Sequence, residues 1–267
     1  MAANKIQVLD KGFVELMDTF GDDLTVVNAA RVSFHKESTQ MNERDAKLIR
    51  FLAEHNHNTP FFHPQARFRL KMPIFVAREW FRHVVGVARN EVSRRYVDEP
   101  PECYVPSVVR ARDAKLKQGS KAEGVANNEE MKSVIEGANI AAMAIYDNLL
   151  KEGVAPEVAR TVLPQGMYTE FIETGSLAFY ARLCKLRMDP GAQWEIRQYA
   201  EAVQKLLIDT FPVSWAALCP FDTNISARDS SNYKFMLQVG VPKGAVIQKM
   251  MKDGVSQADI DSFFSGL

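Results

Sequence analysis

The chain has 267 residues, and its 33 Lys and Arg balance 33 Asp and Glu, so the formal net charge is zero. Hydrophobic residues make up 46% and charged residues 25%, which is typical of a globular protein and excludes a disordered or fibrous chain. A neutral chain has no global field that would favour nucleic acid or an anionic membrane. No run approaches the roughly 20 apolar residues of a membrane helix, and three cysteines without metal-binding spacing favour a reducing compartment. We therefore expect a cytoplasmic protein without a membrane or nucleic-acid partner.

Apolar periodicity assigns most of the chain to helices and strands. In the first half we expect a strand pair at 6–9 and 13–17, a mixed segment at 26–34, a helix at 45–55, a strand at 65–72, a helix at 74–81 and a polar surface excursion at 104–128. In the second half we expect helices at 129–152 and 156–163, a strand at 168–174, helices at 177–187 and 192–211, and two short helices at 246–252 and 257–264.

Strands mixed with several long helices, without regular strand–helix alternation, predict an α+β fold with a mixed or antiparallel sheet packed against the helices. The composition changes after residue 220. We therefore expect one large domain over 1–220 and a C-terminal appendage over 221–267, which carries no catalytic pattern and whose role is open.

Chemistry concentrates between residues 82 and 96, where four arginines accompany a histidine, an asparagine, a glutamate and a serine. A solvated basic loop is the ordinary interpretation of such a run. Two features speak against it: the basic residues flank an apolar stretch at 84–88, and Glu91 places an acceptor among the donors. Because a guanidinium can give two charge-assisted hydrogen bonds to phosphate oxygens, the run suits a phosphorylated ligand.

These residues resemble the signature of the flavin-dependent thymidylate synthases, Arg-His-Arg, a spacer, and Asn-Glu-x-Ser-x-Arg-Tyr. The chain has Arg82-His83-Val84 and then Asn90-Glu91-Val92-Ser93-Arg94-Arg95-Tyr96. Four further segments match the family in order, and they are 57–61 (HNTPF), 75–81 (FVAREWF), 157–164 (EVARTVLP) and 186–196 (LRMD, then AQWEI). The resemblance covers about residues 6–220 and leaves the C-terminal segment unexplained.

The resemblance implies an enzyme that methylates C5 of dUMP to give dTMP, with methylenetetrahydrofolate as the carbon donor and FAD and NADPH as the reductant. It also implies a homotetramer whose sites are shared between subunits. The nucleotide site would be lined by Glu79, Arg82, Glu91, Val92, Ser93, Arg94, Arg95, Arg160 and Arg187. The flavin would be held by residues at the positions of His57, Thr59, Arg82, His83, Val84, Arg89, Asn90, Glu91, Ser176, Ala178 and Arg182.

Several of these positions depart from the family pattern. Val84 replaces the third residue of Arg-His-Arg, and the spacer is one residue longer, so that Arg89 could restore the lost charge. Glu79 stands where the family has glutamine. Ser176, Ala178 and Arg182 stand where members carry an Asn-x-Arg motif and a following Asn. Flavin contacts are therefore expected to be rearranged.

Arg187 is the expected catalytic residue. Methylation requires electron density at C5, and a guanidinium at the pyrimidine oxygen favours the N3-deprotonated ring. Ser93 has no evident base within the motif and is expected to bind rather than attack.

Other interpretations of the sequence stay open. A related flavin-dependent methylase or hydroxymethylase of dCMP or UMP is the main alternative, and a nucleic-acid-binding module is weaker because no aromatic residue interrupts residues 82–95. A catalytic Cys103 is disfavoured, since an acid and prolines surround it. His55, His57 and His63 match no metal-binding spacing, so no metal is expected.

Overall fold

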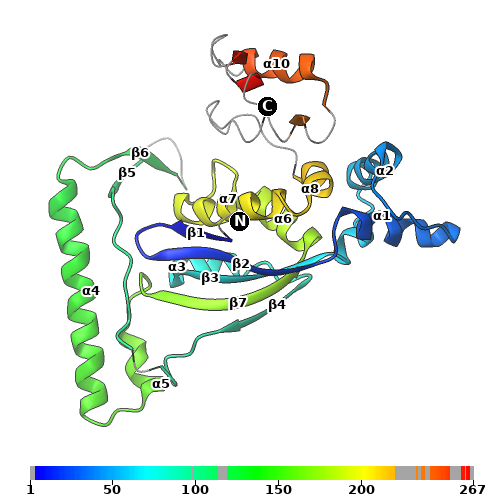
Figure 1. Cartoon of the computed structure of the whole chain (residues 1–267). Helices are drawn as coiled ribbons and strands as arrows, with labels where there is room; N and C mark the ends of the chain where they lie inside the picture. The colour runs from blue at the N-terminus through cyan, green and yellow to red at the C-terminus, as the bar shows by residue number, and fades with distance from the viewer. Residues whose placement is uncertain are drawn as a thin grey trace.

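The computed structural model describes residues 4–97, 99–113 and 119–219, and in the C-terminal segment residues 233, 236–237, 241–252, 260–261 and 263–264. Five antiparallel strands form the central sheet in the order β1-β2-β3-β7-β4 (Figure 1). They are β1 (Lys5–Val8), β2 (Gly12–Phe20), β3 (Gln65–Pro73), β7 (Tyr168–Ser176) and β4 (Val87–Glu91). The α+β prediction with an antiparallel sheet is confirmed.

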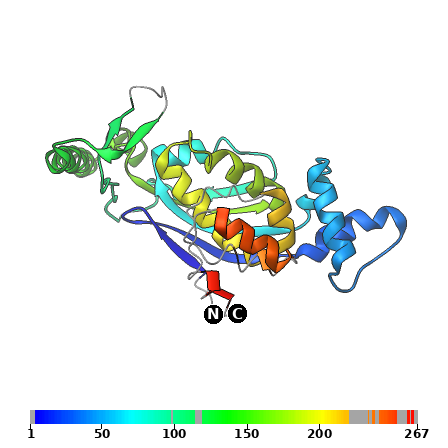
Figure 2. The ribbon, with the colours of Figure 1, turned by 90° about the horizontal axis from the view of Figure 1, so that it is seen from above.

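Helices cover one face of this sheet. They are α3 (Ile74–Trp80), α6 (Leu177–Arg187) and α7 (Trp194–Ile208), and Figure 2 shows α6 and α7 lying over the strands. Helix α8 (Pro212–Leu218) packs against α6 and α7. Phe68 and Leu70 of β3 and Phe171 of β7 enter the core on this face, together with Trp80 and Trp215 from the helices. Phe68 and Leu70 lie on the same face because successive side chains of a strand point to opposite faces. The charged residues of β3 therefore lie on the other, exposed face.

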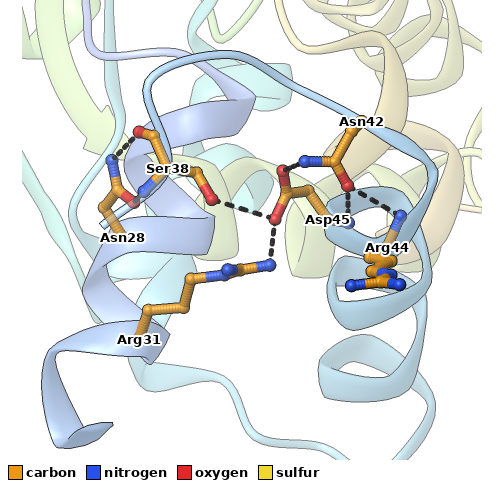
Figure 3. A network of polar contacts seen from close by, with 6 residues as sticks. All are labelled: Asn28, Arg31, Ser38, Asn42, Arg44 and Asp45. Carbon is orange, nitrogen blue, oxygen red and sulfur yellow. Dashed lines mark hydrogen bonds and ion pairs between the residues drawn. The ribbon is translucent and has the colours of Figure 1, made fainter. Parts of the chain in front are cut away.

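A helical lobe extends from one end of the sheet (Figure 2) and consists of α1 (Asp23–Arg31), the 3-10 turn Val32–Phe34 and α2 (Glu43–Glu54). A buried carboxylate joins the two helices: Asp45 accepts hydrogen bonds from Arg31, from Ser38 Oγ at 3.2 Å and from Asn42 Nδ2 at 2.5 Å (Figure 3). Asn42 also caps α2 by accepting from the backbone N–H groups of Arg44 and Asp45. The 3-10 helix Thr59–Phe62 links the lobe to β3.

At the opposite end lie the hairpin β5 (Arg110–Arg112) and β6 (Ser120–Gly124) and the long helix α4 (Asn128–Lys151). Helix α5 (Pro156–Ala159) and the 3-10 turn Arg160–Val162 lead back to β7. Arg110 donates to the buried carboxylate of Glu195 at 2.6 Å and stacks on Trp194, so the hairpin is fastened to α7.

Most predicted elements are present with ends within a few residues. Four features differ: α1 is a regular helix in the mixed segment, the expected surface excursion contains β5 and β6, residues 87–91 of the arginine-rich run form a strand, and α8 follows the helix that was expected to end at residue 211. Within the part of the chain that the structure describes, no helix has the length and hydropathy to cross a membrane.

The described residues of the C-terminal segment form a small apolar cluster of their own. Helix α10 (Lys243–Lys252) contributes Val246 and Met250, which pack with Tyr233 and Ile260. The expected helix at 246–252 is thus part of α10, whereas half of the residues of the one expected at 257–264 lie outside the described residues.

Candidate active site

A cavity of about 610 Å³ opens on the exposed face of the sheet, where β4 ends beside β7. Asn90, Glu91, Val92 and Arg94 line it from the arginine-rich run. These side chains reach it because Asn90 and Glu91 pair with Ile172 and Phe171 of β7, which places the end of the motif at the edge of the sheet. The structure therefore brings together four residues that the sequence assigned to ligands.

A second cavity of about 290 Å³ adjoins the first and shares Glu91, Val92 and Arg94 with it. Arg160, from the 3-10 turn after α5, lines this second cavity. Two arginines and one glutamate from segments about 70 residues apart thus meet around connected cavities. This donor set suits a phosphate group.

Glu91 is held by a residue that sequence reasoning missed. Thr169 Oγ1 donates to Glu91 Oε1 at 2.5 Å, and Thr169 is only 4% exposed. Tyr168, which lines both cavities, donates to Asp10 Oδ1 at 2.5 Å. Both residues lie in the strand predicted at 168–174, so the sequence did indicate their strand. Local periodicity could not show that this strand pairs with β4.

Ser93 and the following arginines form a short network beside the cavities. Ser93 Oγ accepts from Arg95 Nε at 3.2 Å, and the Arg95 guanidinium lies over the ring of Tyr96. Arg94 donates to the carbonyl oxygen of Glu99. Because a guanidinium cannot accept a proton, this geometry gives Ser93 a donor and not a base as its neighbour.

Arg187, at the end of α6, contacts two other predicted site residues. Its Nε donates to His83 Nε2 at 3.0 Å, Nη1 donates to Glu79 Oε2 at 3.3 Å, and Nη2 donates to the Glu79 carbonyl oxygen at 3.1 Å. Burial, followed by the charges of Arg187, Arg89 and Arg182, lowers the pKa of His83 to about 4. The imidazole is therefore neutral near pH 7.

Arg89 points to the helix-covered face of the sheet. Its Nε donates to Glu173 Oε2 at 2.6 Å, and the guanidinium lies between the rings of Phe81 and Phe179. Trp80 Nε1 also donates to Glu173, at 3.1 and 3.2 Å. Burial raises the pKa of Glu173, an effect that Arg89 opposes. Arg89 thus has a partner inside the chain, while its Nη2 is buried without a hydrogen bond among the described residues.

The remaining predicted flavin residues lie around the start of α6 and the 3-10 helix Thr59–Phe62. Ser176 caps α6 by accepting from Phe179 N at 3.2 Å, and Ala178 lies in the core. Arg182 donates to the Val85 carbonyl oxygen at 2.7 Å. His57, Thr59, Arg82 and Val84 are exposed. The predicted site residues therefore fall into three groups within one chain: the cavities, the Arg187 cluster and this surface.

Comparisons with known proteins agree with one another. A family model described as thymidylate synthase complementing protein matches residues 15–213. A flavin-dependent thymidylate synthase of Thermus thermophilus is 44% identical over 212 residues, which cover 79% of this chain and 77% of the relative. That of Thermosipho melanesiensis is 40% identical over 219 residues, which cover 82% and 95%. The solved UMP/dUMP methylase PolB of Streptomyces cacaoi, bound with 5-Br dUMP, has a TM-score of 0.72 at 30% identity and covers 81% of this chain and 98% of that one.

The fold and these matches place the chain in the class of flavin-dependent methyltransferases that act on pyrimidine nucleotides. Within that class, the chain belongs to the flavin-dependent thymidylate synthase family. Its cofactor is FAD, and NADPH and methylenetetrahydrofolate are its co-substrates. The resemblance inferred from the ordered motifs is confirmed.

Proposed function

We propose that this chain methylates dUMP at C5 to give dTMP in the cavities at the end of β4. The convergence of Glu91, Arg94 and Arg160 on connected cavities carries this proposal, because it supplies guanidinium donors for a nucleotide phosphate. Val92 adds an apolar contact, and Ser93 and Arg95 extend the donor set from the same turn. The hydrogen bond from Thr169 Oγ1 fixes the orientation of the Glu91 carboxylate.

Arg187 is the proposed catalytic residue, and Glu79 belongs to the same part of the nucleotide site. A guanidinium held in place before the reaction stabilises negative charge that develops on the pyrimidine ring, and no reorganisation is needed when it develops. Its three contacts with Glu79 and His83 provide such a fixed orientation.

FAD fits the donors at the surface formed by the start of α6 and the 3-10 helix. Arg82 and Arg182 are cations suited to its diphosphate, and the exposed His57 and Thr59 add polar contacts. Asn90 lies at the cavity, and the buried, unbonded Nη2 of Arg89 is a further unused donor among the described residues. When bound, the flavin supplies the hydride that completes the methyl group.

We further propose a homotetramer with shared active sites. The three groups of site residues lie on different parts of one chain, which an assembly from several subunits would bring together. Exposed apolar side chains at both ends of the molecule fit such contacts: Phe20 and Phe34 at the α1 lobe, and Val134, Ile140 and Ile145 on α4. Residues 1–220 would form the catalytic domain and 221–267 an appendage of unknown role.

The free, buried thiols of Cys103, Cys184 and Cys219 are consistent with residence in a reducing cytoplasm.

The test is incubation with dUMP, methylenetetrahydrofolate, FAD and NADPH, followed by mass analysis of the nucleotide, with dCMP and UMP in parallel. We expect dUMP to gain one CH₂ unit. A gain of CH₂O would indicate hydroxymethylation, and faster modification of dCMP or UMP would contradict the proposed substrate. Size-exclusion chromatography with light scattering tests the tetramer.

A further inference from the structure

The guanidinium of Arg187 has an internal acceptor at each of its three nitrogens. Glu79 accepts from Nη1 through its carboxylate and from Nη2 through its backbone carbonyl, and His83 accepts from Nε. Since arginine only donates hydrogen bonds, the Nε2 atom of His83 must be unprotonated. The proton of the neutral imidazole therefore lies on Nδ1.

The charged groups around His83 keep the ring in this form. Arg187 and Arg182 face it from α6 and Arg89 from β4, while Glu79 on α3 is paired with Arg187. Together with burial, the three guanidinium groups depress the pKa of His83 to about 4. A protonated imidazole would place a second cationic donor 3.0 Å from Arg187 Nε and break the contact.

We propose that His83 is a positioning residue for Arg187: its neutral ring holds the Nε edge of the guanidinium while Glu79 holds the other two nitrogens. This proposal rests on the catalytic role of Arg187 given above. It assigns His83 a function besides flavin contact, since both side chains are partly buried and bonded to each other without any ligand. The contact determines the plane in which the guanidinium can meet a pyrimidine ring.

Turnover of His83 variants tests the role. His83→Ala removes the acceptor, and a misplaced catalytic group typically lowers turnover by about 10- to 100-fold; we expect kcat to fall in this range with KM for the nucleotide changed less. His83→Gln retains an acceptor and should recover most of the kcat. If the alanine variant is unstable, His83→Phe fills the space without an acceptor. His35→Asn, an exposed histidine whose left-handed backbone asparagine tolerates, is the control.

A double-mutant cycle and a spectroscopic measurement make the test specific. In an Arg187→Ala background, His83→Ala should lower kcat no further, because its partner is absent. In the flavin-loaded protein labelled with ¹⁵N-arginine, the Nε–H signal of Arg187 should exchange slowly in the wild type and in His83→Gln, and rapidly in His83→Ala.

Unchanged kcat in His83→Ala, alongside a strong loss in Arg187→Ala, would overturn the positioning role alone. Unchanged kcat in Arg187→Ala would overturn both this inference and the proposed catalytic role. A fast-exchanging Nε–H in the wild type would show that the hydrogen bond is not kept in solution and would likewise overturn the inference.

Discussion

Arg89 and Glu173 form a buried ion pair across β4 and β7, and loss of one partner should destabilise the fold strongly. The side chains are 14% and 0% exposed, and the two atoms in contact are 2.6 Å apart. Arg89→Met keeps the aliphatic length but leaves the carboxylate in the core without its cation. Breaking a buried pair in this way costs about 3–5 kcal/mol of unfolding free energy. For a chain of this size the Tm should fall by roughly 10 °C.

The double variant Arg89→Met/Glu173→Gln separates charge from packing. Glutamine can still accept from Trp80 Nε1, and no unpaired charge is left in the core, so at least half of the lost stability should return. The control is Lys47→Met, which breaks the exposed pair with Glu43 and should leave the Tm unchanged. Thermal and urea unfolding followed by circular dichroism measure these effects. An unfolding midpoint of Arg89→Met equal to that of the wild type would contradict this prediction. A double variant less stable than Arg89→Met would contradict it as well.

Binding of FAD to the same proteins tests the second role predicted for Arg89. If Arg89 supplies the charge missing at Val84, the double variant should bind FAD more weakly even where its stability is restored. An FAD dissociation constant equal to that of the wild type would contradict this prediction and leave Arg89 with the internal role alone.

Four further outcomes are expected. Arg187→Ala should lower turnover about 100- to 1,000-fold while the flavin absorbance is retained. Arg160→Ala should weaken nucleotide binding by about 1.5–3 kcal/mol in a calorimetric titration. Asp23→Ala should lower the unfolding free energy by about 1–2 kcal/mol, because Asp23 caps α8 by accepting from the N–H groups of Val213 and Ser214. Since His83 is neutral in the fold and takes up a proton on unfolding, stability should fall as pH drops from 6.5 towards 4, and less so in His83→Gln.

The elements predicted well are those whose pattern is local. The alternation at 65–72 corresponds to β3 (Gln65–Pro73), and the helix expected at 177–187 corresponds to α6 (Leu177–Arg187). In β3, burial alternates with the two-residue period of the strand, whereas the first five residues of α6 are all buried, so this helix appears in the sequence as a largely apolar segment and not as an alternating pattern.

Strand β4 was missed because its sequence is unusual for a strand. It carries Arg89, Asn90 and Glu91, and a charged residue on the covered face is acceptable only with a buried partner. That partner, Glu173, lies 84 residues further along the chain and is opposite Arg89 in the ladder with β7. Local composition therefore gave no strand signal at 87–91, and it is the pairing with the distant strand β7 that makes this segment a strand.

The longer spacer between His83 and Asn90 shows what a sequence motif alone does not predict, namely the direction in which each of its side chains points. Gly86 makes a turn with φ of +84° just before β4, and its carbonyl accepts from Ser176 N at 2.9 Å. A side chain there would be strained, and its Cβ would lie 2.8 Å from Ser176 Oγ. After this turn Asn90 and Glu91 still pair with β7 next to the cavity. Because a slip of one residue would send Arg89 to the opposite face, the register with β7, and not the motif itself, decides which of these side chains can meet a ligand.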